Sequence, residues 1–537
     1  MITRRAHKST PCNRFRKTIS MGRRGDIDMR LDEITGSLDV KIQGDSDIDI
    51  KAITNDSRKV SEGSLYFAIP GAKVDGAKFI PGAVRDGARA VVTEWPVERI
   101  ASELELSEDE MKSVTFVITD NARLTMGIMS SNFYGNPSEK LTVIGITGTK
   151  GKTTTSYMIR DMLEKAGHKT GLVGTIEILD GKNRIPAQNT TPESIELHRI
   201  FSEMLENDLD SVVMEVSSQG LKLNRVAGVD FDYGIFTNLS PDHIGPDEHD
   251  SYEEYRDCKK MLFNMARTGI FNIDDPETAY MMEGASCDIV TFGETEDATY
   301  RASDVKIYSE KGTLGMEYSL GGKLSADVFV DLPGDFSVHN SLAAVAVADM
   351  MGVSLEKICE ILKVIKVRGR VEMIPISDEF TLMIDYAHND MSLKSLLLAI
   401  RKYEPKRIVT LFGCGGNRSK DRRYGMGEMS GRYSDFTIIT SDNPRRENPQ
   451  DIIDDIKVGI GKTDGKYAEI IDRKEAIRYA IMNACPGDII ILAGKGHEDY
   501  QEINGVKHHM DERDLIREIL EEEDVTKICG YNNRYFA

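Results

Sequence analysis

The chain has 537 residues, of which 40% are hydrophobic and 29% are charged, and its formal net charge is −20. This length predicts two to four domains of roughly 100–200 residues, and the dispersed negative charge argues against a nucleic-acid-binding protein. No window approaches the run of about 18 apolar residues that a membrane span requires. Seven cysteines without C-x-x-C spacing favour a reducing, cytoplasmic setting.

The first 138 residues contain a basic extension and a small α/β pattern. Residues 1–28 lack the apolar segment of a signal peptide, so we expect a disordered extension, with Met21 and Met29 as alternative start sites. The stretches LYFAI, ARAVVTE and VTFVITD are typical of short strands. They define an expected first domain at residues 29–138.

Strand-like runs alternate with helical patterns in the rest of the chain, which predicts an α/β fold with largely parallel sheets. A second domain is expected at residues 139–367, with the strands LTVIGIT, SVVMEVSS, FDYGIFTNLS and GIFNIDD. A third is expected at residues 368–523, with TLMIDYAH, RIVTLFGCGG, DFTIITSDNP and DIIILAGKGHE. This third pattern indicates a doubly wound domain without a dinucleotide fingerprint. Residues 524–537 resemble a tail.

The segment GTKGKT, residues 148–153, follows an apolar strand and precedes a helical pattern that continues to Ala166. Such a turn presents backbone N–H groups to an anion at a helix N-terminus. Lys152 can reach outer phosphate oxygens, and the Thr153 hydroxyl can bind magnesium. Ile146 stands where the general P-loop pattern has glycine, so a turn that only connects strand and helix is the alternative. We interpret the segment as a phosphate-binding loop.

Two later strands end in residues that suit a metal ion. Glu215 lies in an apolar strand, where an unpaired carboxylate is costly. Asp242 and His243 follow the next strand. Because magnesium neutralises the charge that develops in phosphoryl transfer, these residues and Thr153 predict a Mg²⁺ site. For His243 taken alone, an ordinary loop histidine is the alternative.

The spelling G-T-x-G-K-T-T resembles the Mur ligase family, ATP-dependent amide-forming enzymes of peptidoglycan and folate metabolism, and the resemblance extends from Met29 to about residue 522. It implies a three-domain architecture with a central P-loop ATPase domain and a Rossmann-like C-terminal domain. It also implies catalytic roles for Lys152, Lys259 and Arg370, with Lys259 a metal-binding carbamate whose pKa burial should lower. The implied ATP-binding residues are Gly148, Thr149, Lys150, Gly151, Lys152, Thr153, Thr154, Asn340 and Asp385.

The same resemblance covers a uridine-linked substrate. NDSRKVSEGSLYFAIPGAKVDGAKFI is similar to the family's uridine-binding segment, and NTTPES and SSQGLKLNRV to segments that hold the muramoyl and phosphate groups. Hydroxyl, amide and guanidinium groups suit such an anionic ligand. The implied residues are Asn55, Ser57, Asn189, Thr190, Thr191, Ser217 and Arg225.

The third domain carries the choice of amino acid. SDNPRRENP resembles the signature of family members that add meso-diaminopimelate, whose distal carboxylate an arginine can pair bidentately. A proline-rich strand-to-helix turn is the alternative. The implied amino-acid-binding residues are Arg418, Asp442, Asn443, Pro444, Arg445, Gly494 and Glu498. The sequence departs from the family pattern at Leu223, Ser337 and Asn417.

The resemblance thus implies an ATP-dependent ligase that adds meso-diaminopimelate to the D-glutamate of UDP-N-acetylmuramoyl-L-alanyl-D-glutamate through an acyl phosphate. Magnesium is the expected cofactor, the partners are small molecules without nucleic acid or membrane, and a monomer is expected. The alternatives are a lysine-adding version, a Mur-type ligase for another acidic substrate, and a P-loop NTPase that acts as a switch or binding module.

Overall fold

The structure is a computed structural model that describes residues 28–36, 38–71, 74–242, 244–245, 248–310 and 312–532. The chain divides into two compact units, Met1–Phe133 and Tyr134–Ala537. Of the expected extension at residues 1–28 only Asp28 is described, and the predicted metal ligand His243 lies outside the described residues.

The first unit contains a five-stranded sheet of order β2-β7-β6-β5-β4, in which β4 to β7 are parallel and β2 is antiparallel. The strands are β2 (Lys41–Gln43), β4 (Ala52–Thr54), β5 (Ser64–Ala68), β6 (Ala88–Thr93) and β7 (Thr115–Ile118), and β1 (Met29–Arg30) pairs with β3 (Asp49–Ile50). The helices are α1 (Leu31–Thr35), α2 (Ile80–Arg85), α3 (Val97–Glu103), α4 (Glu108–Ser113) and α5 (Ala122–Phe133). The three strands expected in this unit are confirmed.

The second unit begins with an eleven-stranded sheet that is parallel from β9 to β16 and antiparallel at both ends. Its strands in sheet order are β11 (Arg184–Pro186), β10 (Glu177–Leu179), β9 (Thr170–Val173), β12 (Ser211–Glu215), β8 (Thr142–Thr147), β13 (Phe231–Phe236), β14 (Ala266–Asn272), β15 (Asp288–Gly293), β16 (Tyr300–Glu310), β17 (Thr313–Gly322) and β18 (Ala326–Val330). The antiparallel β16 to β18 meander was not anticipated from the sequence.

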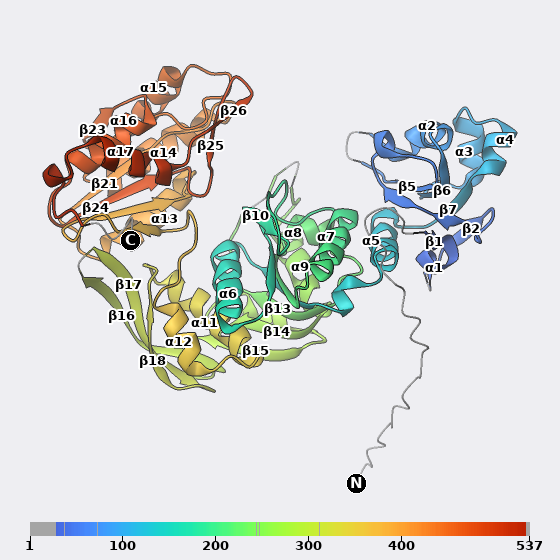
Figure 1. Cartoon of the computed structure of the whole chain (residues 1–537), viewed down its shortest axis with the longest axis horizontal. Coiled ribbons are helices and arrows are strands. Elements are labelled where there is room, and N and C mark those ends of the chain that lie inside the picture. Colours follow the sequence, from blue (N-terminus) through green and yellow to red (C-terminus); the bar gives the residue numbers. More distant parts are fainter. Residues whose placement is uncertain are drawn as a thin grey trace, which may run out of the picture. The chain divides into compact units, whose positions relative to one another are not determined.

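Two hydrophobic layers hold helices on both faces of this sheet (Figure 1). Because side chains alternate along a strand, Ile144 and Ile146 of β8 pack with α6 and α11, whereas Val143 packs with α7. The helices are α6 (Lys152–Ala166), α7 (Ser194–Glu206), α8 (Ser218–Lys222), α9 (Tyr252–Lys260), α10 (Thr278–Met282), α11 (Phe336–Met350) and α12 (Leu355–Leu362). The carboxyl ends of β8, β9, β12, β13 and β14 therefore share one edge.

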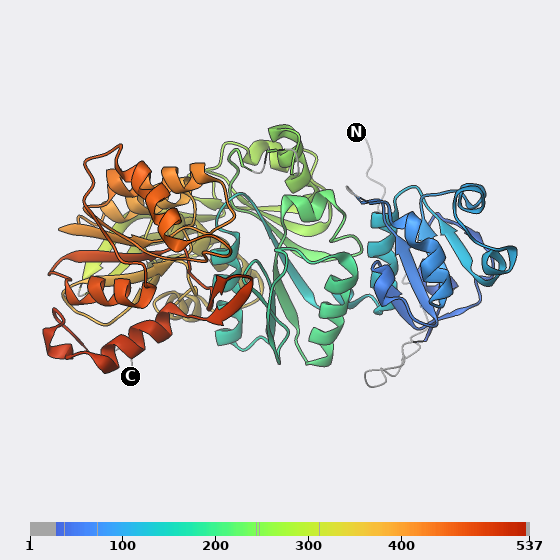
Figure 2. The same ribbon diagram turned by 90° about the horizontal axis from the view of Figure 1, so that it is seen from above.

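A second sheet, of order β19-β20-β24-β21-β22-β23, follows in the same unit and is parallel except for β19. The strands are β19 (Glu372–Ile374), β20 (Thr381–Asp385), β21 (Arg407–Phe412), β22 (Phe436–Ile439), β23 (Tyr467–Glu469) and β24 (Asp488–Ala493), with a hairpin of β25 (Tyr500–Ile503) and β26 (Val506–His509). Helices α13 (Asp390–Arg401), α14 (Lys420–Tyr433) and α15 (Pro449–Ile460) cover one face, and α16 (Arg473–Met482) and α17 (Glu512–Glu522) the other (Figure 2). The doubly wound prediction is confirmed.

The end of the chain differs from the expected tail at residues 524–537. Ile528 is buried, and the Ser377 hydroxyl donates to the Cys529 carbonyl. Tyr531 pairs with Ser377, and the Asn532 amide donates to the Ile376 carbonyl. Residues 524–532 therefore pack on the second sheet, because one short apolar segment fits beside β19 and β20. Among the described residues, no helix has the length and apolar character needed to cross a membrane.

Candidate functional site

The predicted phosphate loop joins β8 to α6, and its two glycines are required by close contacts. Gly148 has φ of 147°, and a Cβ there would lie 2.0 Å from the Thr237 hydroxyl. Gly151 has φ of 87° and begins α6 without a side-chain cap. Because the first N–H groups of a helix lack intrahelical acceptors, the amides from Gly151 onward are suited to an anion.

The other half of the loop is already bound by protein. The amides of Thr149 and Lys150 donate to the carbonyl and side-chain oxygens of Asn238, each at 2.9 Å. The Lys150 side chain is exposed. These two amides are therefore not among the loop N–H groups that are available to an anion, because the chain that follows β13 binds them. Asn238 is a structural support of the loop that sequence reasoning missed.

Two lysines meet at this loop without carboxylate partners among the described residues. The Lys152 ammonium donates to the Gly148 carbonyl at 2.8 Å and to the Thr149 carbonyl at 3.1 Å. The Lys259 ammonium donates to the same Gly148 carbonyl at 2.9 Å and lies over the Tyr255 ring. Burial lowers the pKa of Lys152, and the Arg370 charge adds to this effect.

Lys259 is the most deeply buried of these cations, with 1% of its surface exposed. Burial, and secondarily the Lys152 charge, holds its pKa well below the usual value. The expectation of a lowered pKa at this lysine is confirmed. A buried amine with a lowered pKa has a larger neutral fraction, which is the form that can react with carbon dioxide.

Glu215 and Thr153 form an oxygen-rich cluster beside the lysines. Glu215 is 1% exposed, and its Oε2 accepts from the hydroxyls of Thr153 at 3.1 Å and Thr175 at 3.0 Å. Its Oε1 accepts from the Thr175 amide at 2.9 Å. Sequence reasoning missed Thr175, although the Gly-Thr pair after β9 was an available signal. The donor set of one carboxylate and two hydroxyls fits the oxygen preference of Mg²⁺.

Most residues predicted to bind the uridine-linked substrate gather next to Glu215. The Thr175 hydroxyl is 3.1 Å from that of Thr190, and the Thr191 hydroxyl is 3.2 Å from that of Ser217. Arg225 donates to the Thr191 carbonyl at 3.1 Å. Asn189 is exposed nearby in sequence, whereas Asn55 and Ser57 belong to the first unit, just after β4. Thr175 thus connects the predicted metal ligands to the predicted substrate-binding residues.

A cavity of about 120 Å³ opens beside the loop, between the ends of β13 to β15 and the start of α11. Buried Asn340 accepts from Thr155 through Oδ1, and its Nδ2 has no partner among the described residues. Ser337 instead donates to the Pro333 carbonyl at 3.0 Å. Aromatic faces and amides together suit a flat heterocycle. The lining residues are Thr237, Asn238, Asn272, Phe292, Phe336, His339 and Asn340.

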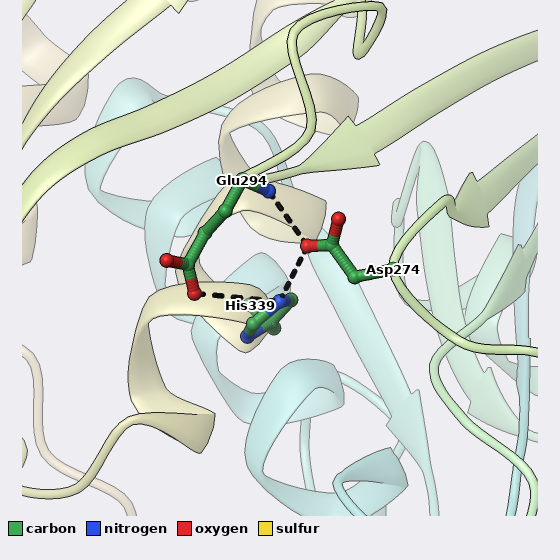
Figure 3. Close-up of side chains that lie close together, drawn as sticks. All are labelled: Asp274, Glu294 and His339. Carbon is green, nitrogen blue, oxygen red and sulfur yellow. Dashed lines mark hydrogen bonds and ion pairs between the residues drawn. The ribbon is translucent and has the colours of Figure 1, made fainter.

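His339, which lines this cavity, lies close to the carboxylates of Asp274 and Glu294 (Figure 3). His339 Nε2 is 2.9 Å from an Asp274 oxygen and 4.0 Å from Glu294. Asp274 also accepts from the Glu294 amide at 2.6 Å and from the Thr295 hydroxyl at 2.6 Å. Through these contacts Asp274 connects the loop after β15 to α11, which gives the cluster a structural role.

Arg370 lies in the linker that leads into the second sheet. Its guanidinium stacks on the Tyr386 ring at 4.9 Å. Asp385 is 7% exposed, and its two oxygens accept from the amides of Val371 and Ala387 at 2.9 and 2.8 Å. Its described partners are thus backbone groups that hold the linker, and the ribose contact implied by resemblance stays a prediction.

The predicted amino-acid-binding residues come together at the carboxyl edge of the second sheet. A Cβ on Gly415 would lie 2.8 Å from Nη1 of Arg445 and 3.8 Å from Cγ of Arg418, so both arginines border this glycine. A Cβ on Gly494 would lie 3.2 Å from an Asp442 oxygen. Two guanidinium groups next to acidic and amide groups are complementary to a zwitterion.

Several charged groups of this edge are already paired. Arg445 donates from Nε to Glu502 at 3.1 Å and from Nη1 to the Gly416 carbonyl at 2.7 Å. Asn443 donates to Glu498 at 2.9 Å. Lys495, which is fully buried, joins Asn443 at 3.1 Å and Glu498 at 2.7 Å. Sequence reasoning missed Lys495 and Glu502. Pro444 contributes backbone, because its carbonyl packs against Gly416.

Comparison with known proteins decides the family. The model described as "Mur ligase middle domain" matches residues 146–348, "Mur ligase, glutamate ligase domain" matches residues 369–496, and "Mur ligase family, catalytic domain" matches residues 49–134. A UDP-N-acetylmuramoyl-L-alanyl-D-glutamate--2,6-diaminopimelate ligase from Caldanaerobacter subterraneus subsp. tengcongensis is 42% identical over 92% of this chain and 100% of its own length. The chain belongs to the Mur ligase family.

Further relatives and solved structures are also similar to this chain. The ligase of the same description from Clostridioides difficile is 39% identical over 92% of this chain and 99% of its own length. A solved structure of such a ligase has a TM-score of 0.67 and 29% identity, covering 92% of this chain and 99% of that one. Mycobacterium tuberculosis folylpolyglutamate synthase, with a TM-score of 0.53, 16% identity and 69% and 92% coverage, shares the fold. The three-domain Mur ligase architecture expected from the sequence is confirmed.

Proposed function

We propose that this Mur ligase uses ATP to join meso-diaminopimelate to the D-glutamate of UDP-N-acetylmuramoyl-L-alanyl-D-glutamate. The observation that carries the proposal is the edge formed by Asp442, Asn443, Arg445 and Arg418, where two guanidinium groups stand beside acidic and amide groups. Lysine has no distal carboxylate to pair with an arginine, so this edge favours diaminopimelate. The names of the relatives support the same substrate pair.

The first chemical step forms an acyl phosphate. An oxygen of the D-glutamate carboxylate attacks the γ-phosphorus of ATP, and the bond to ADP breaks. We assign Lys152 and Arg370 to the transferred phosphate, and the charge of Arg370 is near enough to act on Lys152. They offset the negative charge that spreads over the transferred group. The base of ATP is assigned to the cavity beside Asn340, whose Nδ2 has no partner in the described part of the chain and suits a ring nitrogen.

Magnesium is the proposed cofactor. Thr153, Glu215 and Lys259 as its carbamate would hold the ion, with His243 as a further candidate from the sequence. When bound, Mg²⁺ supplies positive charge to the phosphate oxygens. Carbamylation forms an N–C bond between the neutral Lys259 amine and carbon dioxide with loss of one proton. It converts a buried cation into an anion among oxygen donors, which removes the repulsion by Lys152.

In the second step, the amine of diaminopimelate attacks the acyl carbon after losing a proton, and the tetrahedral intermediate releases phosphate. No protein nucleophile takes part, so catalysis depends on positioning and electrostatics. Asn189, Thr190, Thr191, Ser217 and Arg225 would hold the substrate in the second unit, and Asn55 and Ser57 its uridine in the first. We place the reaction in the cytoplasm, in a monomer that contributes to peptidoglycan precursors.

Phosphate release tests the proposal. The purified chain is given ATP, magnesium and the UDP-linked dipeptide, with diaminopimelate, lysine or no amino acid. Release with diaminopimelate, at least tenfold above release with lysine, supports the proposal. Equal or faster release with lysine identifies the lysine-adding version. Release without any amino acid identifies a P-loop NTPase switch and refutes the ligase assignment.

A further inference from the structure

The linker that carries Arg370 rests directly on the loop Gly494–Glu498. Gly369 has φ of 67°, and a Cβ on it would lie 2.2 Å from the His497 amide nitrogen. Only a glycine permits this approach of the two backbones. The next residue but one, Val371, has φ of 46°, which is strained for a β-branched side chain. The linker is therefore held in one conformation by its surroundings.

Arg513, at the start of α17, joins this linker to the loop. Its Nε donates to Glu372 at 2.9 Å, and its Nη2 donates to the second oxygen of the same carboxylate. Both terminal nitrogens also donate to the Gly496 carbonyl at 3.2 Å, and Nη1 reaches Asp511 at 2.9 Å. A lysine has no planar fork and cannot reproduce this set of contacts.

A second set of contacts, made by the Tyr386 ring, joins the linker to the same loop. The Tyr386 ring contacts both the Arg370 guanidinium, at 4.9 Å, and the His497 ring, at 4.5 Å. His497 is flanked in sequence by Gly496, the acceptor of Arg513, and by Glu498, the partner of Asn443. The loop Gly494–Glu498 is thus joined to the Arg370 linker by two routes, the Tyr386 ring contacts and the Glu372–Arg513 bridge.

We propose that Arg513 is a positioning residue that couples occupancy of the amino-acid site to the placement of Arg370 at the phosphate. The inference rests on the proposed function, in which Glu498 contacts the incoming amino acid and Arg370 contacts the γ-phosphate. Contact of the amino acid with Glu498 stabilises the loop Gly494–Glu498 in the conformation seen here, and the fork of Arg513 extends this stabilisation to Glu372 and Arg370. The enzyme therefore binds the ATP phosphates most tightly when the amino acid is bound.

The test measures a coupling ratio by calorimetry. The Kd of a methylene-bridged ATP analogue is determined with magnesium and the UDP-linked dipeptide, with and without saturating diaminopimelate. Coupling of the usual strength makes the analogue bind about fivefold or more tightly with diaminopimelate in the wild type. Arg513→Leu, Arg513→Lys and Glu372→Gln should bring the ratio to within twofold of one. Their Kd without diaminopimelate should stay within twofold of the wild type.

Arg517→Leu is the matched control, because Arg517 lies one turn later on α17, is half exposed, and pairs only with Asp514 among the described residues. It should keep the wild-type ratio. If Arg513→Lys and Glu372→Gln keep the coupling ratio of the wild type, the inference is overturned, and these two variants decide if Arg513→Leu does not fold. The inference is also overturned if the coupling ratio of the wild-type protein itself is one. Absence of diaminopimelate-dependent phosphate release by the wild type refutes the proposed function instead.

Discussion

The phosphate loop and the amino-acid edge are both glycine-rich turns at the carboxyl ends of parallel strands, yet they treat charge in opposite ways. In the phosphate loop, Lys152 and Lys259 donate only to carbonyl oxygens, and neither forms an ion pair within the described part of the chain. At the amino-acid edge, Arg445 is paired with Glu502 and Lys495 with Glu498.

The difference matches the two kinds of ligand. A polyanion such as ATP brings negative charge to lysines that form no ion pair among the described residues, and whose pKa values are lowered mainly by burial. A zwitterion brings no net charge, so its site can be balanced in advance and select by geometry. We therefore expect that replacing a lysine at the loop lowers the rate of phosphate release strongly and raises thermal stability. Changes at the amino-acid edge should alter the KM for the amino acid and leave the KM for ATP unchanged.

The largest effect is expected for Lys259→Met, which removes a buried amine and keeps a similar volume. Phosphate release should fall by roughly 100–1,000-fold, the scale of losing one electrostatic contact to the transition state. The midpoint of thermal unfolding should rise by roughly 2–4 °C, because a buried polar amine is replaced by an apolar side chain.

Lys260→Met provides the comparison for this prediction. Lys260 is the next residue, is partly exposed, and lies over the Tyr280 ring. Its replacement should leave phosphate release within about twofold, the effect of a surface change. A Lys259→Met protein that is both active and less stable than the wild type would show that Lys259 has only a structural role.

A smaller and more selective effect is expected for Arg445→Ala. Loss of a charge-assisted contact of about 1.5–3 kcal/mol should raise the KM for diaminopimelate by roughly 10–150-fold. The KM for ATP should stay within about twofold, and the preference over lysine should decrease. Steady-state phosphate release at varied substrate concentrations measures all three.

Arg446→Ala is the control for this variant, because Arg446 is adjacent and exposed. An equal rise in the KM for diaminopimelate in both variants, or a parallel rise in the KM for ATP in Arg445→Ala, would contradict a dedicated carboxylate contact. Only Arg445→Ala removes the ion-pair partner of Glu502, so the comparison reports the loss of this guanidinium together with its pairing.

The sequence predicted those parts of the site that depend on local pattern. The loop before Thr153 and the strand that ends at Glu215 were recognisable separately, and parallel pairing of β8 with β12 then brings them together. Residues whose role depends on a distant partner were missed. Thr175 is forty positions from Glu215, and Arg513 is 141 positions from Glu372.

Parts of the fold were missed for a related reason. The β16 to β18 meander has a mixed pattern of exposed and buried residues, because one part of it faces solvent. Neither a continuous apolar run nor a helical period marks it. The terminal segment at Ile528 has too few apolar residues to be recognised, although its few contacts suffice to attach it to the second sheet.

The smallest effect is expected for Thr175→Val, which tests whether the oxygen cluster belongs to the phosphate region. Valine keeps the shape and the backbone amide that donates to Glu215, and removes only the hydroxyl that reaches Glu215 and Thr190. Loss of about 1 kcal/mol at one hydrogen bond should lower kcat/KM for the UDP-linked dipeptide by roughly fivefold. The magnesium concentration for half-maximal phosphate release should rise, because Glu215 is less well oriented.

Thr170→Val separates this role from packing. Thr170 begins the same strand, β9, is buried, and bonds to the Ser211 hydroxyl at 2.9 Å, away from the predicted ligands. It should lower stability by a similar amount without changing the magnesium dependence. If both variants shift that dependence equally, Thr175 supports β9 alone. If only Thr175→Val shifts the magnesium dependence, Thr175 contributes to the metal site. The Thr175 hydroxyl then links the phosphate loop to the residues proposed to bind the uridine-linked substrate.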